Sequence, residues 1–580
     1  MNLKECFEKE IRYFIDEAHR FAEVHPDQAR SLSLEDVRNR DPYVERLIEA
    51  FAFLSGTIKQ ILDDDFTDLA QEIINSVWPH YLLPLPSCTI IEMTPIKGRI
   101  QSGQLIEKGA LIETSPVSTG LPCRFTTCAP VYVRPISISK AGFVYRSDGQ
   151  TSMQIRLSHL PGLNWEKIDT TPLRVYLHGD RSLALTLFYI FQNNIKNVIV
   201  CWEDENRGYQ ETVLSSSLVF PTDSLPENDL PLLPYPEHSF SGFRLLEEYF
   251  FFPEKFRFYD IDIFNHIGNP IEDSEIIIDL ILSGEEDFRI DPDRRNFRLH
   301  CTPAINLFNA AAEPIRLNDS KPFYRVTVNN AVSGHYIPYN ITKVNGLRLN
   351  SGYRTTYQSF NEYRHADSQD ESAYFYKKLK YGVQDQIELL IGIKRPMGIG
   401  PEIISIDLMC SNDKVVQEVR LGDIEFPCQG IPDFVYVNNL TTPIPPVWPS
   451  LEGQNLWTII NSIALNYKSL DTPEQFKGLL FFYNRSKDRA NIRRIESIDS
   501  IEIKPAENII QGYPVRGISF QIILKDDHFI NSGDLLCFSK ILSRVIGMYV
   551  PINSSCHLSI IEKRSRRKYE WQVKGVQKII

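Results

Sequence analysis

A few short groups of histidine and cysteine side chains are the first places in this 580-residue sequence where chemistry could arise. Cys123 and Cys128 lie five positions apart, and His300 is followed directly by Cys301. A structural zinc site uses four such ligands, usually as two closely spaced pairs, and neither group has a second pair beside it. Neighbouring residues of a strand would also point to opposite faces. We therefore expect these side chains to be structural and predict no metal site.

Charged runs form a second set of candidates. Residues 63–65 are three consecutive aspartates, which we interpret as solvated carboxylates at a helix end, with a cation site as the alternative. Residues 291–295 combine two aspartates with two arginines, and this pattern is typical of a turn with local ion pairs. Asp260 and Asp262 alternate with isoleucines, so they are expected on the solvent face of a strand.

The sequence has no Gly-x-Ser-x-Gly nucleophile motif and no phosphate-binding loop of the Gly-x-x-x-x-Gly-Lys type. Gly398-Ile399-Gly400 precedes Pro401, which predicts a turn. We therefore expect no catalytic residue and no cofactor, and a protein that is not an enzyme. A cytoplasmic hydrolase with β-rich domains is the alternative, because a site built from distant residues leaves no local motif. A carbohydrate-binding or adhesin-like β protein would have been favoured by a signal peptide and paired cysteines.

The composition of the chain limits the classes of partner and the cellular compartment that we expect. The net charge is −12, and a negative field repels phosphate, so neither nucleic acid nor an anionic membrane is expected to bind. The N-terminal residues do not resemble a signal peptide, no stretch predicts membrane insertion, and ten scattered cysteines fit a reducing cytoplasm. The basic run 563–568 is interpreted as solvated, with docking of an acidic protein as the alternative.

Helices are predicted for roughly the first 80 residues, and they must position whatever this region does. Apolar residues between Leu3 and Phe21 recur at steps of four and three, a spacing that suits packing against other helices. Asp41-Pro42 predicts the start of a second helix, which carries a wide apolar stripe to Leu62, and a third helix is expected from Thr67 to before Pro79. The side chains that we predict at a protein interface are Phe7, Ile11, Phe14, Phe21, Leu47, Phe51, Leu54 and Ile58.

The rest of the chain predicts an α+β multidomain protein. Short β-branched segments from Cys88 onward indicate antiparallel sheet, interrupted by a helix after Asp180 and another near 244–250. Pro-rich stretches at 221–236 and 441–449 indicate boundaries. The C-terminal region should contain helices at 457–466, 473–483 and 535–548 and strands at 518–524 and 557–561. The predicted domains are an N-terminal helical region (1–87), a β-rich domain with one helix (88–222), a second β-rich domain (237–440) and a C-terminal α+β domain (453–580).

Several blocks together resemble the TssF family of type VI secretion, also called VasA or ImpG. No single block is specific, but their order and spacing match over nearly the whole chain. Two departures concern Asp413, where the family usually has arginine after Cys-Thr-Asn, and Ser554-Ser555, which replaces a more aromatic run. The blocks include Glu10-Ile11-Arg12-Tyr13, Asp41-Pro42-Tyr43-Val44-Glu45-Arg46-Leu47, Pro79-His80-Tyr81-Leu82, Leu245-Leu246-Glu247-Glu248-Tyr249-Phe250 and Pro303-Ala304-Ile305-Asn306-Leu307-Phe308.

The resemblance implies a structural role. Members of this family are similar to phage baseplate wedge proteins, and they form a wedge from two TssF copies and one TssG. The wedge contacts TssK and TssE and surrounds the VgrG spike, where tube and sheath assembly begins. The baseplate would lie in the cytoplasm, docked on the inner-membrane complex. The phage likeness also implies that residues 1–80 join an intermolecular helical bundle. The alternative is that these helices pack only on their own β domains.

Limited proteolysis tests the predicted boundaries. Because exposed linkers are the usual sites of first cleavage, we predict that a protease first cuts within 222–237 or 441–452, and mass spectrometry of the fragments would locate the cut. Residues 245–256, predicted to be structured, serve as the internal control. A first cut inside that segment would show that the division into domains is wrong.

Overall fold

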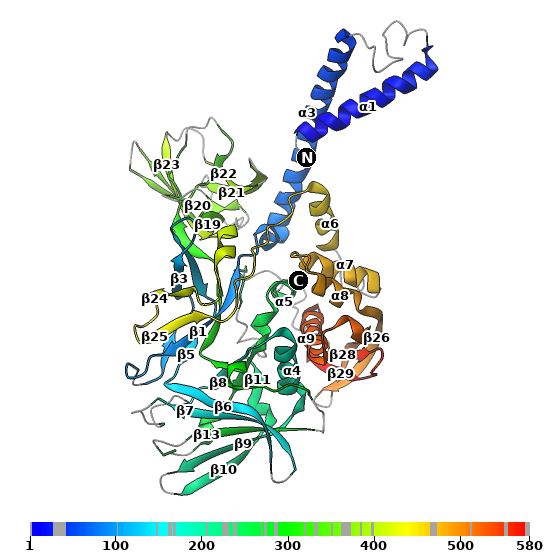
Figure 1. Cartoon of the computed structure of the whole chain (residues 1–580). Coiled ribbons are helices and arrows are strands. Elements are labelled where there is room, and N and C mark those ends of the chain that lie inside the picture. Colours follow the sequence, from blue (N-terminus) through cyan, green and yellow to red (C-terminus); the bar gives the residue numbers. More distant parts are fainter. Residues whose placement is uncertain are drawn as a thin grey trace.

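Six β-sheets and eight α-helices make up the described part of a computed structural model of the chain (Figure 1). Two long helices form the N-terminal end, two shorter helices lie among the sheets of the middle, and the C-terminal region combines helices with a sheet of its own, so the α+β multidomain class is confirmed. The structure describes residues 3–574 apart from 27–41, 101, 147–148, 161–164, 166–169, 205–206, 223–230, 236–240, 268–269, 272–274, 284–287, 318–320, 330–333, 350–351, 361–372, 383–385, 396–399, 464–471, 511–512 and 550–554.

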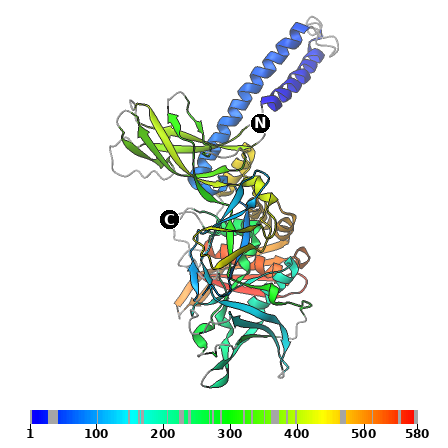
Figure 2. The same cartoon turned by 60° about the vertical axis from the view of Figure 1, so that its left-hand side comes forward.

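A pair of long helices stands away from the rest of the molecule in both views of the cartoon (Figures 1 and 2). Helix α1 (Leu3–Val24) packs along the first half of helix α3 (Pro42–Val77). The sequence predicted a break between Leu62 and Thr67, but α3 continues through it as one helix of 36 residues. The prediction was wrong because aspartate inside a helix costs at most about 0.7 kcal/mol relative to alanine, and no proline stops the helix there.

Close backbone contact and one buried carboxylate hold α1 against α3. A Cβ atom at Gly56 would lie 3.1 Å from the backbone nitrogen of Phe7, so glycine lets the two helices approach at this point. One turn further along α1, the Glu10 carboxylate accepts hydrogen bonds from Ser55 Oγ (2.7 Å) and Lys59 Nζ (3.0 Å). Ser55 lowers the pKa of the Glu10 carboxyl, with Lys59 acting in the same direction, so Glu10 is ionised and sets the register of the pair.

A six-stranded sheet that bends toward closure forms the first β unit. Its strand order is β24-β3-β4-β15-β1-β25, and the two end strands approach each other without pairing. The buried side chain of Asn439 spans this gap: its Oδ1 accepts from the backbone N–H groups of Gly422 (2.9 Å) and Ile424 (3.2 Å). The strands are β1 (Cys88–Pro95), β3 (Leu111–Pro116), β4 (Pro122–Thr127), β15 (Cys301–Ile305), β24 (Ile424–Gln429) and β25 (Val435–Asn439), with β2 (Gln104–Ile106) and β5 (Val131–Val133) paired beside them.

Two further sheets lie below this unit in Figure 1, in the orders β10-β9-β13-β7-β6 and β11-β12-β8-β14. Helix α4 begins as predicted after Asp180, whose side chain accepts from the Leu183 N–H (2.9 Å) and so caps the helix. The elements are β6 (Ile136–Tyr145), β7 (Thr151–His159), β8 (Leu173–Leu177), α4 (Arg181–Tyr189), β9 (Ile195–Asp204), β10 (Gly208–Ser215), β11 (Val219–Pro221), α5 (Ser241–Phe251), β12 (Phe258–Ile261), β13 (Ile276–Leu282) and β14 (Phe297–Leu299).

A larger sheet forms the upper arm of the β region, with the path β16-β23-β19-β20-β21-β22-β18 and β17 paired to β23. Strand β23 illustrates its construction: Ile404, Ile406 and Leu408 are buried, whereas Ser405 and Asp407 between them are exposed. The strands are β16 (Phe308–Ala311), β17 (Ile315–Leu317), β18 (Tyr324–Arg325), β19 (Ile337–Arg348), β20 (Arg354–Ser359), β21 (Tyr374–Tyr381), β22 (Ile387–Lys394) and β23 (Glu402–Ser411).

The C-terminal region is an α+β unit whose four strands run in the order β26-β27-β28-β29. Strands β27 and β28 are parallel, and α9 provides the crossover between them. Helix α7 has the bounds that its sequence predicted. The elements are α6 (Gly453–Ile463), α7 (Pro473–Tyr483), α8 (Arg489–Glu496), β26 (Ile498–Ile510), β27 (Tyr513–Leu524), α9 (Ser532–Tyr549), β28 (Ser555–Glu562) and β29 (Lys568–Lys574).

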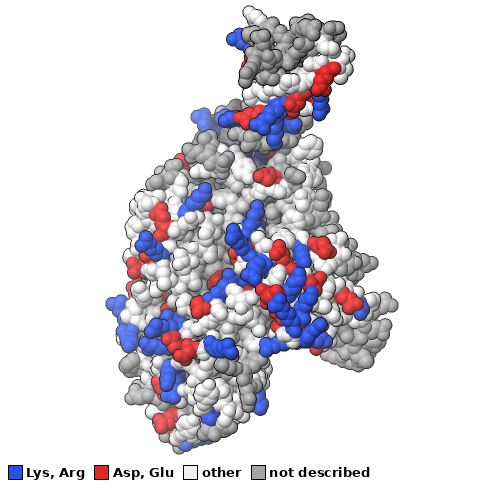
Figure 3. Space-filling view, turned by 45° about the vertical axis from the view of Figure 1, so that its right-hand side comes forward, with Lys and Arg blue, Asp and Glu red and all other residues white. Residues whose placement is uncertain are grey.

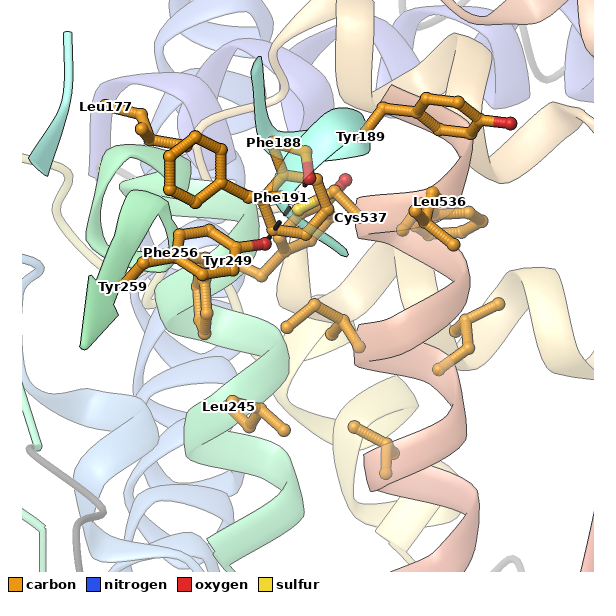
Figure 4. Packing of buried hydrophobic residues seen from close by; sticks show 14 of the residues in the cluster. Leu177, Phe188, Tyr189, Phe191, Leu245, Tyr249, Phe256, Tyr259, Leu536 and Cys537 are labelled. Atoms are coloured by element: carbon orange, nitrogen blue, oxygen red, sulfur yellow. Dashed lines mark hydrogen bonds between the residues drawn. The ribbon is translucent and has the colours of Figure 1, made fainter. Parts of the chain in front are cut away.

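One apolar core joins the C-terminal unit to the β region. Tyr249 of α5, Tyr259 of β12, Cys537 of α9 and Phe188 of α4 come together in this core (Figure 4), and the Tyr259 hydroxyl donates a hydrogen bond to the backbone oxygen of Phe188 (3.4 Å). Sheet pairing also crosses the predicted boundary at 222–237, because β13 lies between β9 and β7. The division into four domains therefore remains a prediction. In the described part of the chain, one sheet and the main apolar core each contain residues from more than one of the predicted domains.

Two adjacent carboxylates on α5 are buried where these parts meet. Glu247 accepts from Arg485 (2.7 Å), and Arg485 also donates to the backbone oxygen of Leu83, in the segment that leads from α3 to β1. Glu248 accepts from Lys255 and from the backbone N–H groups of Leu232 (2.8 Å) and Leu233 (3.0 Å). Burial raises the pKa of the Glu247 carboxyl, and Arg485 opposes that shift.

Asp260 also lies inside the structure. The sequence placed it on a solvent face, but it is buried on β12, where Arg174 bonds both carboxylate oxygens (2.9 and 3.2 Å) and Thr222 donates a third hydrogen bond (2.8 Å). The prediction was wrong because both faces of β12 are covered, and alternation then no longer distinguishes solvent from core.

Replacing Arg485 by methionine tests the electrostatic junction on α5. Arg485→Met leaves the Glu247 carboxylate buried without its cation, a change that costs about 3–5 kcal/mol. We expect the thermal unfolding midpoint to fall by more than about 5 °C, measured by circular dichroism. Adding Glu247→Leu removes the stranded charge and should restore part of the loss. Arg295→Met, at an exposed arginine, is the matched control, and an Arg485→Met protein as stable as this control would contradict the expectation.

Candidate functional site

The cysteine and histidine candidates are placed inside the fold. Cys123 and Cys128 are both buried, and burial raises the pKa of each thiol to about 12. His300 was expected in a strand with its side chain opposite that of Cys301. It instead lies between β14 and β15 with φ of 55°, because the chain turns sharply there. No group of three or more histidine, cysteine or acidic residues among the described positions could hold a metal ion.

One cavity of about 200 Å³ does bring a histidine, a cysteine and an aspartate together, as a hydrolase would need. Its lining includes His300, Cys301 and Asp260. Burial raises the pKa of the Cys301 thiol well above its usual range, and it lowers the pKa of His300 to about 3. His300 Nε2 also accepts from the backbone N–H of Arg134 (3.1 Å). The thiol therefore stays protonated, the imidazole is a poor base, and this arrangement provides no nucleophile.

Two other candidates lie outside the described residues or side chains. The side chains of residues 63–65 are not described, although their backbone is part of α3. Positions 398 and 399 of the predicted Gly-Ile-Gly turn are not described either. No described helix combines the length and the apolar character needed to cross a membrane.

Exposed apolar side chains are concentrated on the projecting pair of helices. Eleven of the 25 large hydrophobic residues that are exposed in the described part of the chain lie on α1 or α3. Monomeric soluble proteins rarely expose large contiguous apolar patches, and such a patch usually marks a surface that another chain covers. They are Tyr13, Phe21, Val24, Tyr43, Leu47, Phe51, Phe53, Leu54, Ile58, Phe66 and Leu69.

The four α3 residues predicted at an interface form one exposed row. Leu47, Phe51, Leu54 and Ile58 are 58, 54, 55 and 51% exposed. Their spacing of four, three and four residues places them within about 60° around the helix. Gly56, which contacts α1, lies on roughly the opposite side. The row is therefore not used by α1. We call these four residues the α3 seam.

The four α1 residues predicted at an interface differ in exposure: three lie partly against α3 and one is exposed to solvent. Phe7, Ile11 and Phe14 are half-buried, and the Phe7 ring packs edge-on against Phe53 of α3 at a centroid distance of 6.3 Å. Phe21 is exposed. The sequence thus grouped these positions correctly on one stripe of α1, but it did not reveal that α3 covers part of that stripe.

Tyr43 was not among the predicted interface residues, although it is 81% exposed. It lies four positions before Leu47, so extending the row by one step along the sequence would have identified it. Phe53 was also missed, and no sequence signal identified it, because it lies off the stripe and beside α1.

The far end of α3 is fixed in the body of the molecule. Ala70, Ile74 and Trp78 belong to the main core, and Gln71 exchanges hydrogen bonds with the backbone of Leu379 on β21. Asp68 forms an ion pair with Lys378 of the same strand. The α3 seam is therefore carried on a helix that is anchored at one end, and a seam with this spacing is suited to knobs-into-holes packing with another helix.

On the face shown in Figure 3, basic and acidic side chains are interspersed over the body. The described residues of this face do not form the continuous basic stripe that marks nucleic-acid binding. This side of the molecule therefore gives no electrostatic reason to assign a nucleic-acid partner.

Comparison with known proteins relates this arrangement to bacterial secretion. The chain is 26% identical to a type VI secretion system component, TssF1 of Pseudomonas aeruginosa, with 99% of this chain and 98% of the relative aligned. Its fold matches a chain of a TssK-TssF-TssG baseplate subcomplex solved by cryo-electron microscopy (TM-score 0.78, 23% identity, 92% of this chain and 99% of that one). It also matches a chain of the type VI baseplate complex (TM-score 0.65, 21% identity, all of both chains). The family model described as "Type VI secretion system, TssF" matches residues 1–577, and the chain therefore belongs to the TssF family of the type VI secretion system.

Proposed function

We propose that this chain is a structural subunit of the type VI baseplate wedge and that it has no catalytic activity. Its family membership and a fold shared with chains of two baseplate complexes support this role. The partners are TssG, a second copy of this chain, TssK and TssE, arranged around the VgrG spike where tube and sheath assembly starts. The complex is cytoplasmic and docks on the inner-membrane complex.

The α3 seam carries the proposal. Leu47, Phe51, Leu54 and Ile58 point away from α1 and are exposed in the isolated chain. Each large apolar side chain transferred from water into a packed interface contributes about 1.5–3 kcal/mol. Because the spacing of the seam matches a helical partner, we propose that helices of TssG and of a second copy cover it in an intermolecular bundle. On α1, which lies on the opposite side of α3, the exposed Phe21 and the accessible parts of Phe7, Ile11 and Phe14 would meet other helices of the same bundle.

The alternative is that these helices pack only on their own β domains, and it applies to the C-terminal half of α3. That half does pack internally, through Ile74 and Trp78. The N-terminal half packs on α1 by the side that carries Gly56, which leaves the seam for another chain. This division of α3 supports the proposal that its C-terminal half packs internally and its N-terminal half packs on other chains.

An aspartate in the seam separates the two possibilities. Leu47→Asp should not affect the isolated chain, because the side chain is already in solvent. In a packed interface the same carboxylate loses its hydration and the leucine contacts, at a cost of several kcal/mol. We expect an unchanged thermal midpoint and at least a hundredfold weaker capture of TssG, measured by co-purification and by titration.

Leu421→Asp is the matched control, because Leu421 is 62% exposed on the body of the molecule. Its binding to TssG should remain at the wild-type level. The proposal fails if Leu47→Asp protein is folded and still captures TssG as tightly as the control does. A fall in the thermal midpoint of the isolated Leu47→Asp chain would instead favour internal packing.

A further inference from the structure

A second surface with the character of a docking site lies between the six-stranded sheet and the strands β14 and β6. It is a cleft of about 480 Å³, and its strand β6 lies in the lower part of the molecule in Figure 1, whereas the projecting helices lie at the top. Four cationic side chains line it and only one carboxylate, Glu92. The cationic residues are Lys97, Arg294, Arg295 and Arg298. A local excess of positive charge is unusual on a chain whose net charge is −12.

The charges of the cleft are only partly balanced by the protein itself. Arg298 lies 3.4 Å from a carboxylate oxygen of Glu92, and Arg295 is 3.6 Å from Asp293. Both distances exceed those of a tight charge-assisted hydrogen bond. Lys97 and Arg294 are exposed. Burial lowers the pKa of the neighbouring His300 to about 3, so that residue adds no charge near neutral pH.

The basic run 563–568 provides a contrast. It forms the turn between β28 and β29, where Lys563 contacts Asp499 (2.7 Å) and Arg564 contacts Asp527 (3.0 Å). Lys568 lies 2.5 Å from Glu570, so three of the five cations in this run have a carboxylate at short distance. Arg294 and Arg295 belong to the segment 291–295, which the sequence indicated as a turn with local ion pairs; together with Arg298 and Lys97 they give the cleft more cations than carboxylates.

The apolar residues of the lining are edges of the core rather than a free surface. Ile136 of β6 and Phe297 of β14 are each 1% exposed, Leu299 of β14 is also buried, and Ile138 of β6 is half-buried, so Ile138 is the apolar side chain that a ligand in the cleft would meet. Arginine forks match carboxylates in geometry, and an apolar side chain offers nothing to a bare phosphate. A ligand that uses both the arginines and Ile138 must carry an acidic group beside an apolar one. An extended protein segment in which aspartate or glutamate alternates with large apolar residues meets this requirement.

We propose that this cleft is a docking site for an acidic, partly apolar segment of a protein partner, with a carboxylate held between Arg294, Arg295 and Arg298. The site is distinct from the α3 seam in chemistry and position. It therefore provides the wedge with a second contact, one that weakens as salt rises because its charges lie near solvent.

Fluorescence polarisation with a defined probe tests the site on the full-length chain. The probe is a fluorescein-labelled octapeptide of alternating aspartate and leucine, and its control replaces each aspartate by asparagine. We expect the acidic peptide to bind at low salt at least tenfold more tightly than its control. The Arg294→Glu, Arg295→Glu double variant should weaken that binding at least tenfold. Both arginines are exposed, so folding should be retained.

A charge-matched variant controls for net charge. Arg316→Glu, Lys343→Glu changes the charge equally at exposed positions on β17 and β19, and it should leave the affinity within twofold of the wild type. A carbodiimide, which joins a carboxylate to an amine, should couple the bound peptide to Lys97, and mass spectrometry of the digest would identify that link.

Three results would overturn the proposal. The first is equal binding of the aspartate and asparagine peptides, including no binding of either. The second is an unchanged affinity in the Arg294→Glu, Arg295→Glu protein, or coupling at lysines other than Lys97. The third is displacement of the peptide by equal concentrations of inorganic phosphate, or by a decathymidylate that depends on the same two arginines, which would assign the cleft to phosphate groups.

Discussion

Two neighbouring carboxylates, Glu247 and Glu248, impose the main constraint on this structure, because both are buried on one turn of α5. A buried charge is tolerated only with a partner and hydrogen bonds, and each finds them in a different part of the chain. Glu247 binds Arg485, which also holds the backbone of Leu83, whereas Glu248 binds Lys255 and two backbone N–H groups. The position of α5 therefore determines how the base of α3, the β region and the C-terminal unit meet.

The contacts around Glu247 and Arg485 also explain how α3 can project into solvent while its C-terminal end stays fixed to the body of the molecule. Trp78, at the end of α3, packs against Tyr81 and Tyr483 with ring centroids 5.1 and 5.4 Å apart, directly beside the Arg485 contact. The lower part of α3 is thus fixed by aromatic packing and by ion pairs. A side chain in the α3 seam is held at a defined direction relative to the sheets, and a pre-positioned surface loses less conformational entropy when a partner binds.

Sequence patterns predicted the structural features that depend on residues close together along the chain. Helix α4 with its Asp180 cap, helix α7 from Pro473 to Tyr483, and the spacing of the seam all follow from local periodicity and capping. What depends on contacts between distant segments was missed. Asp260 is buried because both faces of β12 are covered, and its charge is balanced there by Arg174, 86 positions away; no local pattern contains that information. The path of β13 into a sheet between β7 and β9 is a choice of topology that alternation alone does not specify.

Charged side chains usually lie at the surface and large apolar side chains inside. This structure departs from that rule in both directions, and both departures suit a subunit that joins other chains. Charges lie inside at Glu247, Glu248 and Asp534, where Arg494 forms a fully buried pair at 2.8 Å. Apolar groups lie outside along α3. Ion pairs in the interior are directional and allow few alternative arrangements. An exposed apolar row can pack against a partner in several geometries, but it is stabilised only when a partner buries it. A subunit that must keep one shape while joining other chains needs the first kind of contact within itself and the second at its edge.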